Sequence, residues 1–421
     1  MHRIIAAFLA ATSCVAVAQA QDNVAAGQPL GAAFTLDQAV AVAGGSAPAA
    51  DAAQAGIKAA QAARTVAGLR PNPQVQTQVE NVVGSGPYRG VSQAETTVGL
   101  NIPIELGGKR SARIAVADAQ FNRAALVAAI TQADIRLQVT ALYIDAVAAE
   151  RRVITARDQF RIGQDALNAA KVRVQAGRAS PLEEQRADVA KLNAEAEVQR
   201  ALRLAEAVRI NLERRIGQPI TGALDVAVLD RLPPTTYGPT MVASTGTLAL
   251  AAADADLAIA DAGVRLAKSQ RVPDVAIGPA IRRLSATNDT AAVLSLSIPI
   301  PLFNSGRAAV AQASAQRSQA EAQRRMTALD VEQAITDAQA EADTAATAAR
   351  NASGPALAAA QEAARIARIG YREGKFGQLD LLDAERTLSQ TRVAAIEALA
   401  AFHNAKARLE RLIAPAPVQG N

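Results

Sequence analysis

Two short turns of the sequence carry the side chains best suited to chemistry. The motif GRASPLE at 177–183 places Glu183 six residues after a glycine, and GKFGQLD at 374–380 places Asp380 at the same spacing. Asp383 follows one helical turn later and shares a helix face with Asp380. A carboxylate in the first turn of a helix can cap it, because the N-terminus carries partial positive charge. Carboxylates from several chains could instead form an acidic ring around a pore, and the sequence leaves both interpretations open.

No catalytic or metal-binding pattern accompanies these acids. The chain has one cysteine, Cys14, and two histidines, of which only His403 lies beyond the first twenty residues. Soft metals need clusters of cysteine, methionine or histidine, and phosphate sites need a glycine-rich loop. We therefore predict no enzymatic activity, no cofactor and no bound metal, and expect His403 to be a packing or surface residue. With a net charge of +5 spread among acids and only 3% aromatic residues, nucleic-acid binding is not expected.

Residues 1–20 have the pattern of a signal peptide. An apolar run ends in the small-residue motif AQA, which predicts cleavage before Gln21. The alternative is attachment of a lipid at Cys14. Beyond this leader there is no run of about 18 apolar residues, so the sequence predicts an exported protein without a membrane-spanning helix.

A long internal repeat organises the elements that must position the acids. The two turns lie 197 residues apart, and IPIELGGKR at 102–110 returns as IPIPLFNSGR at 298–307. A period near 200 residues is too long for a solenoid and indicates a tandem duplication. We expect a first repeat at 21–216, a proline-rich linker at 217–246, a second repeat at 247–413 and a C-terminal tail at 414–421.

Each repeat reads as a helix, a β-hairpin, a long helix and a shorter returning helix. The last three are expected at 74–106, 108–176 and 181–216, and again at 274–303, 307–373 and 378–413. At 1.5 Å per residue the long helix would span about 100 Å, far more than a compact domain needs.

Heptad spacing runs along both long helices and predicts coiled-coil seams. The first seam comprises Ile135, Val139, Leu142, Ala146, Ala149, Val153, Ala156, Phe160, Gly163, Leu167, Ala170 and Val174. The second comprises Val331, Ile335, Ala338, Ala342, Ala345, Ala349, Ala352, Ala356, Ala359, Ala363 and Ile366. Ser353-Gly354-Pro355 is expected to kink or interrupt the second helix.

The four strands alternate between apolar and polar residues over about ten positions, which is typical of a transmembrane β-barrel but also of a half-buried soluble sheet. The alanine-rich helices offer little bulk to cover an apolar sheet face. Four strands leave open edges, which lipid does not tolerate, whereas three chains would supply twelve strands around a water-filled interior. We therefore expect a mainly α-helical protein with a membrane β part, assembled as a homotrimer.

The duplicated plan, the IPIELGGKR and IPIPLFNSGR motifs and the two tip turns resemble the TolC family of outer-membrane efflux channels. The GGKR form is similar to the CzcC-like branch, which serves heavy-metal RND efflux. The resemblance implies a trimeric tandem-repeat channel in the cell outer membrane, extending into the periplasm, with a twelve-strand β-barrel and a long α-helical coiled-coil barrel. It also implies a periplasmic adaptor protein, an inner-membrane RND pump and outer-membrane lipid as partners.

The resemblance further implies roles for residues of the two turns. Glu183, Asp380 and Asp383 match acids that line a periplasmic gate, and Tyr371 matches a tyrosine whose polar ties help to hold it shut. Phe376 stands where some members carry a gate arginine. Docking of the adaptor is expected at Gly177, Ser180, Leu182, Gly374, Gly377 and Leu379.

The function expected from this reading is passive export through an outer-membrane duct, with heavy-metal cations as cargo. Two alternatives remain at this stage. The chain could be a soluble periplasmic coiled-coil scaffold or adaptor, or the duct could carry drugs or secreted proteins.

Overall fold

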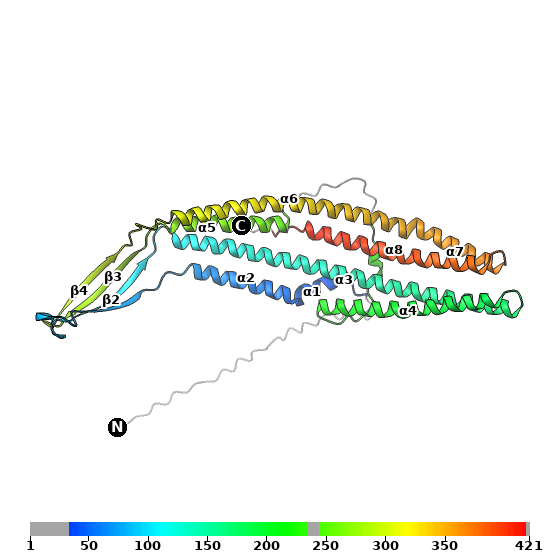
Figure 1. Cartoon of the computed structure of the whole chain (residues 1–421), viewed down its shortest axis with the longest axis horizontal. Coiled ribbons are helices and arrows are strands. Elements are labelled where there is room, and N and C mark those ends of the chain that lie inside the picture. Colours follow the sequence, from blue (N-terminus) through cyan, green and yellow to red (C-terminus); the bar gives the residue numbers. More distant parts are fainter. Residues whose placement is uncertain (1–32, 234–243, 418–421) are drawn as a thin grey trace, which may run out of the picture.

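The computed structural model describes residues 33–233 and 244–417. The molecule is elongated, with a β-sheet at one end, long roughly parallel helices in the middle and two helical turns at the other end (Figure 1). No helix in these two ranges combines the length and the apolar character needed to cross a membrane. The expected signal peptide and Cys14 lie outside the described residues.

The helices follow the repeat in chain order. They are α1 (Leu36–Ser46), α2 (Pro48–Ala67), α3 (Lys109–Gln175), α4 (Pro181–Ile216), α5 (Leu248–Ser269), α6 (Arg307–Asn351), α7 (Leu357–Arg372) and α8 (Gln378–Leu412). Short 3₁₀ turns cover Gly86–Tyr88 and Val226–Asp230, and a π-helical turn covers Ala352–Ala356. The helix expected over 307–373 is therefore interrupted at Ser353-Gly354-Pro355, as the sequence predicts.

The four strands form one antiparallel sheet in the order β1-β2-β3-β4. They are β1 (Gln74–Glu80), β2 (Glu95–Ile104), β3 (Val275–Leu284) and β4 (Asp289–Ser297). The two repeats thus join edge to edge through β2 and β3, while β1 and β4 each have only one neighbour among the described strands.

The sheet has one apolar and one polar face, as predicted. Directly opposed residues share a face, and the register pairs apolar residues with one another, as in Val75 with Leu100 and Ile277 with Leu296. On the other face Arg282 forms ion pairs with Glu95 at 2.7 Å and with Glu80 at 3.0 Å. The charged side chains of three strands therefore meet on the face opposite the exposed apolar one.

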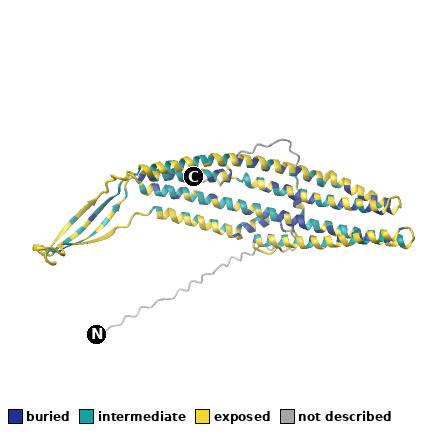
Figure 2. Cartoon of the chain, viewed as in Figure 1, coloured by how far each residue is buried: buried dark blue, intermediate teal, exposed yellow. Residues whose placement is uncertain are grey.

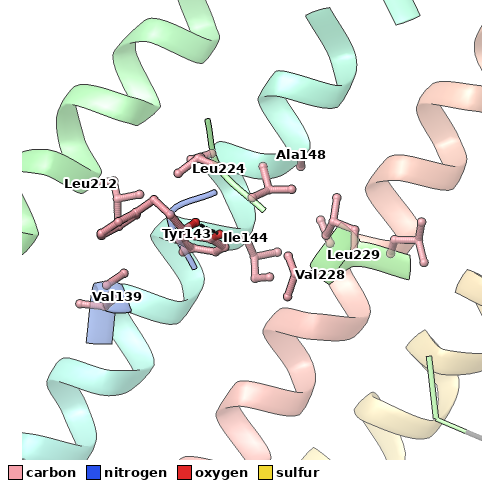
Figure 3. Packing of buried hydrophobic residues seen from close by; sticks show 14 of the residues in the cluster. Val139, Tyr143, Ile144, Ala148, Leu212, Leu224, Val228 and Leu229 are labelled. Atoms are coloured by element: carbon pink, nitrogen blue, oxygen red, sulfur yellow. Dashed lines mark hydrogen bonds between the residues drawn. The ribbon is translucent and has the colours of Figure 1, made fainter. Parts of the chain in front are cut away.

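The largest core lies halfway along the helices and draws on both repeats. Figure 3 shows Tyr143 and Ile144 of α3 packed beside Leu212 of α4, with Leu229 from the segment that connects the repeats. The fully buried Tyr143 hydroxyl donates to the Phe34 carbonyl at 2.6 Å and accepts from the Asp225 backbone at 3.0 Å. His403 also belongs to this region, where its Nε2 lies 3.1 Å from the Leu229 carbonyl, so it is a packing residue.

The predicted seam of α3 is confirmed. Its residues are buried or half-buried from Ile135 to Val174. The seam of the second repeat is confirmed as far as Ala349 and is wrong beyond Ala352. The predicted Ala356, Ala359, Ala363 and Ile366 are exposed, while Leu357, Ala360, Ala364 and Ala367 face inward. The physical reason is the π-helical turn, which contains one residue more than an α-helical turn and moves the seam on by one position.

Much of the helical surface of a single chain remains exposed (Figure 2). α2 has no buried residue although it packs along α3. Alanine seams bury little area per residue, so single-chain packing provides only modest stabilisation along these helices.

Candidate functional site

The first tip turn connects α3 to α4. Gly177 has φ +69°, a left-handed conformation that glycine adopts at little cost, and the Arg178 backbone donates back to the Arg173 carbonyl at 2.8 Å. Ser180 begins α4, and its hydroxyl accepts from the Leu182 backbone at 3.3 Å. The turn leaves the Leu182 side chain 54% exposed at the end of the molecule.

The second tip turn connects α7 to α8 in the same way. Gly374 has φ +72°, and the Gly370 carbonyl accepts from the Lys375 backbone at 2.7 Å. Gly377 is the N-cap of α8, and Leu379 is 60% exposed. Each tip therefore presents an exposed leucine just after its turn.

Two side chains, those of Arg173 and Gln378, tie the tip of the first repeat to that of the second. The Arg173 guanidinium of α3 lies over the Tyr371 ring of α7, with its central carbon 4.5 Å from the ring centroid, and its Nη1 donates to the Tyr371 carbonyl at 3.5 Å. The Gln378 side-chain amide of α8 donates to the Glu183 carbonyl of α4 at 2.6 Å. These contacts bridge about 195 residues of sequence, so they hold the two helical hairpins together only in the folded tip.

Tyr371 is buried at the centre of this junction, where it packs against Ala367 and Leu381. Burial raises the pKa of the Tyr371 hydroxyl, the guanidinium of Arg173 opposes this shift, and the nearby Glu183 carboxylate adds to it. Among the described residues the hydroxyl has no hydrogen-bond partner, and the same holds for Glu183 Oε2 and Gln378 Oε1. Within this chain the contacts of Tyr371 with Arg173 are therefore made by its ring and its backbone carbonyl and not by its hydroxyl.

The two aspartates lie apart from this junction in a single chain. The Asp380 carboxylate accepts from the Gly377 backbone at 2.9 Å and so caps α8. Asp380 and Asp383 are both exposed on the first turns of α8. Capping uses one side of the Asp380 carboxylate and leaves both side chains open to solvent or to another chain.

Behind the tip the hairpins are separated by a cavity of about 660 Å³. Its walls include Ile162 and Ala166 of α3, Ala194 of α4, and Tyr371. Within the second hairpin Arg368 pairs with the buried Glu385 carboxylate through both oxygens, the longer contact being 2.8 Å. On the core side of the cavity α3 and α8 are joined again by the ion pair of Arg152 with Glu397 at 3.2 Å, so the ties at the tip act together with contacts nearer the core.

The structure places Glu183 and Tyr371 together at this junction, and it adds two partners that the sequence did not indicate. Arg173 and Gln378 were not singled out, because no local pattern links them to residues of the other repeat. Across the described ranges, no three or more histidine, cysteine or acidic side chains are arranged to hold a metal ion.

Comparison with known proteins gives the family. The model of the family described as outer membrane efflux protein matches residues 42–218 and 243–414, which are the two repeats in turn. The chain belongs to this family. It is therefore an outer-membrane efflux protein, and the family is one of transport proteins and not of enzymes.

Individual relatives agree with this assignment. The chain is 29% identical to the cobalt-zinc-cadmium resistance protein CzcC of Cupriavidus metallidurans over 90% of both chains. It is 30% identical to the nickel and cobalt resistance protein CnrC of the same organism over 65% of this chain and 64% of the relative. The open-state MtrE outer membrane channel of Neisseria gonorrhoeae has a similar fold, with a TM-score of 0.73, 20% identity, and coverage of 90% of this chain and 88% of that one.

Proposed function

We propose that three copies of this chain form a passive duct through the outer membrane that exports heavy-metal cations. The observation that carries the proposal is the sheet, which has an apolar face and two edges that no other described strand of the chain covers. Open edges are not tolerated in lipid, and three sheets of four strands would close on one another as a twelve-strand barrel. The polar face with Arg282, Glu80 and Glu95 would then line the water-filled interior.

The tips form the periplasmic gate in this proposal. Threefold symmetry brings three copies of Glu183, Asp380 and Asp383 together where the pore narrows. Like charges at close range repel, so closure requires attractive contacts that offset the repulsion. The contacts of Arg173 with Tyr371 and of Gln378 with Glu183 are of this kind, because they hold the two hairpins of each chain together.

The proposed partners are a periplasmic adaptor protein and an inner-membrane RND pump. Exposed Leu182 and Leu379, one beyond each turn, offer apolar anchors for the adaptor at the end of the molecule. Docking there would act on the turns begun by Gly177 and Gly374 and release the ties behind them. The names of the two metal resistance relatives support a cation as cargo, and selection among metals would be made by the pump.

Deletion of the gene followed by challenge with zinc, cobalt, cadmium, nickel, copper and several drugs tests this function. We expect sensitivity to one or more metals, restored by the intact chain but not by Leu182→Asp with Leu379→Asp at equal protein level. Sensitivity to drugs alone would contradict a metal cargo. Release of the protein from outer membranes by high-salt or carbonate washing would contradict the lipid-facing sheet.

A further inference from the structure

A single π-helical turn lies between the main core and the tip of the second hairpin, where α6 passes into α7 (Figure 1). Pro355 has no N–H, and its ring clashes with the carbonyl four residues earlier, so regular α-helical bonding fails here. Gly354 leaves helical geometry with φ −101° and ψ −105°. The Ala349 carbonyl accepts from the Ser353 hydroxyl at 2.7 Å as well as from the Ala352 backbone N–H. Local chemistry therefore fixes the irregular turn at these three residues.

Comparison of the two repeats shows what the turn accommodates. From Ile135 to Val153, buried seam residues of α3 correspond to those of α6 with an offset of 196, ending at Ala349. From Phe160 to Val174 the offset is 197, and the corresponding residues are Leu357, Ala360, Ala364, Ala367 and Tyr371. The second repeat thus contains one extra residue between Ala349 and Leu357. A π turn contains one residue more than an α-helical turn, so the helix beyond it keeps the corresponding face toward the other helices.

The turn matters because α7 carries two apolar seams that are one residue apart. One comprises Leu357, Ala360, Ala364, Ala367 and Tyr371, which are buried or half-buried. The other comprises the exposed Ala356, Ala359, Ala363 and Ile366 together with Gly370, which is buried beneath the Phe376 ring; an unbroken helix of the same length would turn this seam toward α3. One residue corresponds to about 100° of rotation, whereas a straight helix drifts only about 20° per heptad. Packing of apolar groups alone does not decide whether Tyr371 or Gly370 lies opposite Arg173.

We propose that Ser353-Gly354-Pro355 is a positioning element that selects the seam containing Tyr371. By absorbing one residue, the π turn places the Tyr371 ring under the Arg173 guanidinium instead of placing Gly370 there. The proposal deepens the proposed function, because it rests on the role of Tyr371 in holding the tip closed. It assigns control of the tip to three residues that contact neither Tyr371 nor Arg173.

Two variants that both lack the π turn and differ by one residue test the proposal. The first is Ser353→Ala with Gly354→Ala and Pro355→Ala at full length, and a Cβ at Gly354 would meet nothing within 4 Å. The second deletes Gly354 and carries Ser353→Ala and Pro355→Ala. The structure of each trimer in mild detergent is determined by electron cryo-microscopy, and the current through each isolated channel is recorded in planar bilayers.

We expect the shortened variant to keep Tyr371 against Arg173, near the 4.5 Å of the native tip, and to conduct like the native channel. In the full-length variant Tyr371 should turn by about 100°, with Gly370 in its place and a raised current. Tyr371 against Arg173 in both variants, or displaced in both, would overturn the proposal. If the full-length variant does not assemble, the position of Tyr371 in the shortened variant tests the proposal. Failure of the shortened variant to assemble would also contradict the proposal. If Tyr371 lies where we expect in each variant but the two currents are equal, the positioning role of Ser353-Gly354-Pro355 is supported and the role of Tyr371 in the gate is refuted.

Discussion

Replacement of Arg173 by methionine tests whether the contact with Tyr371 holds the tip closed. Methionine keeps a long apolar side chain and removes the charge that lies 4.5 Å from the Tyr371 ring centroid. A cation–π contact at a partly buried site contributes about 1 kcal/mol. Three copies that open together would lose about 3 kcal/mol, which lowers the ratio of closed to open channels about 100-fold.

Single-channel recording in planar bilayers measures this ratio as the open probability. Arg178→Met is the matched control. Arg178 lies in the turn that follows α3 and is exposed, and its replacement removes the same charge. The two variants change the electrostatic potential of the tip alike, so any difference between them isolates the contact with Tyr371. Equal open probabilities in the two variants would refute the reasoning.

Three further predictions follow from the same structure. Asp380→Asn with Asp383→Asn should lower cation selectivity, measured as the reversal potential. The double variant should also lose block by multivalent cations added on the periplasmic side, measured as the current that remains. Unchanged selectivity and block would mean that these acids only cap the helix. Tyr143→Phe should destabilise the protein by about 1–2 kcal/mol in thermal unfolding, because two hydrogen bonds of its hydroxyl are lost while the Asp225 N–H and the Phe34 carbonyl keep the bond between them, whereas exposed Tyr88→Phe should be neutral. Burial lowers the pKa of the His403 imidazole in the folded protein. As the pH falls, the imidazole therefore takes up a proton in the unfolded chain before it does so in the folded one. The free energy of unfolding should then fall as the pH drops below about 6.5. His403→Gln should lack that part of the pH dependence, and identical pH profiles of unfolding would contradict it.

Helices and strands could be predicted from local patterns, because capping, proline and two-residue alternation act over a few residues. The two-faced sheet and the break at Ser353-Gly354-Pro355 are examples. The seam beyond Ala352 could not be obtained by counting heptads, because a π turn changes the count without changing the composition. The offset of 197 residues between the two tip turns, against 196 between the first parts of the two seams, is the signal in the sequence that could have revealed this shift.

The tip was harder to predict than the fold, since its contacts join the two repeats. The acids stand out by their place after glycine turns and Tyr371 by the family resemblance, but Arg173 and Gln378 acquire their partners only when the hairpins meet. Asp380 illustrates the ambiguity, because its carboxylate caps α8 and also remains exposed. Whether it lines a pore depends on neighbouring chains and not on the contacts within one.

The number of subunits in the assembled protein tests the account most directly. Alanine seams and two sheet edges without a neighbour both require other chains, so a single chain should not be stably folded. Mass measurement of the purified protein in mild detergent should give three times the mass of one chain. The full sequence, with the expected signal peptide, has a mass of 43.4 kDa. A monomer with full helical content would contradict the account.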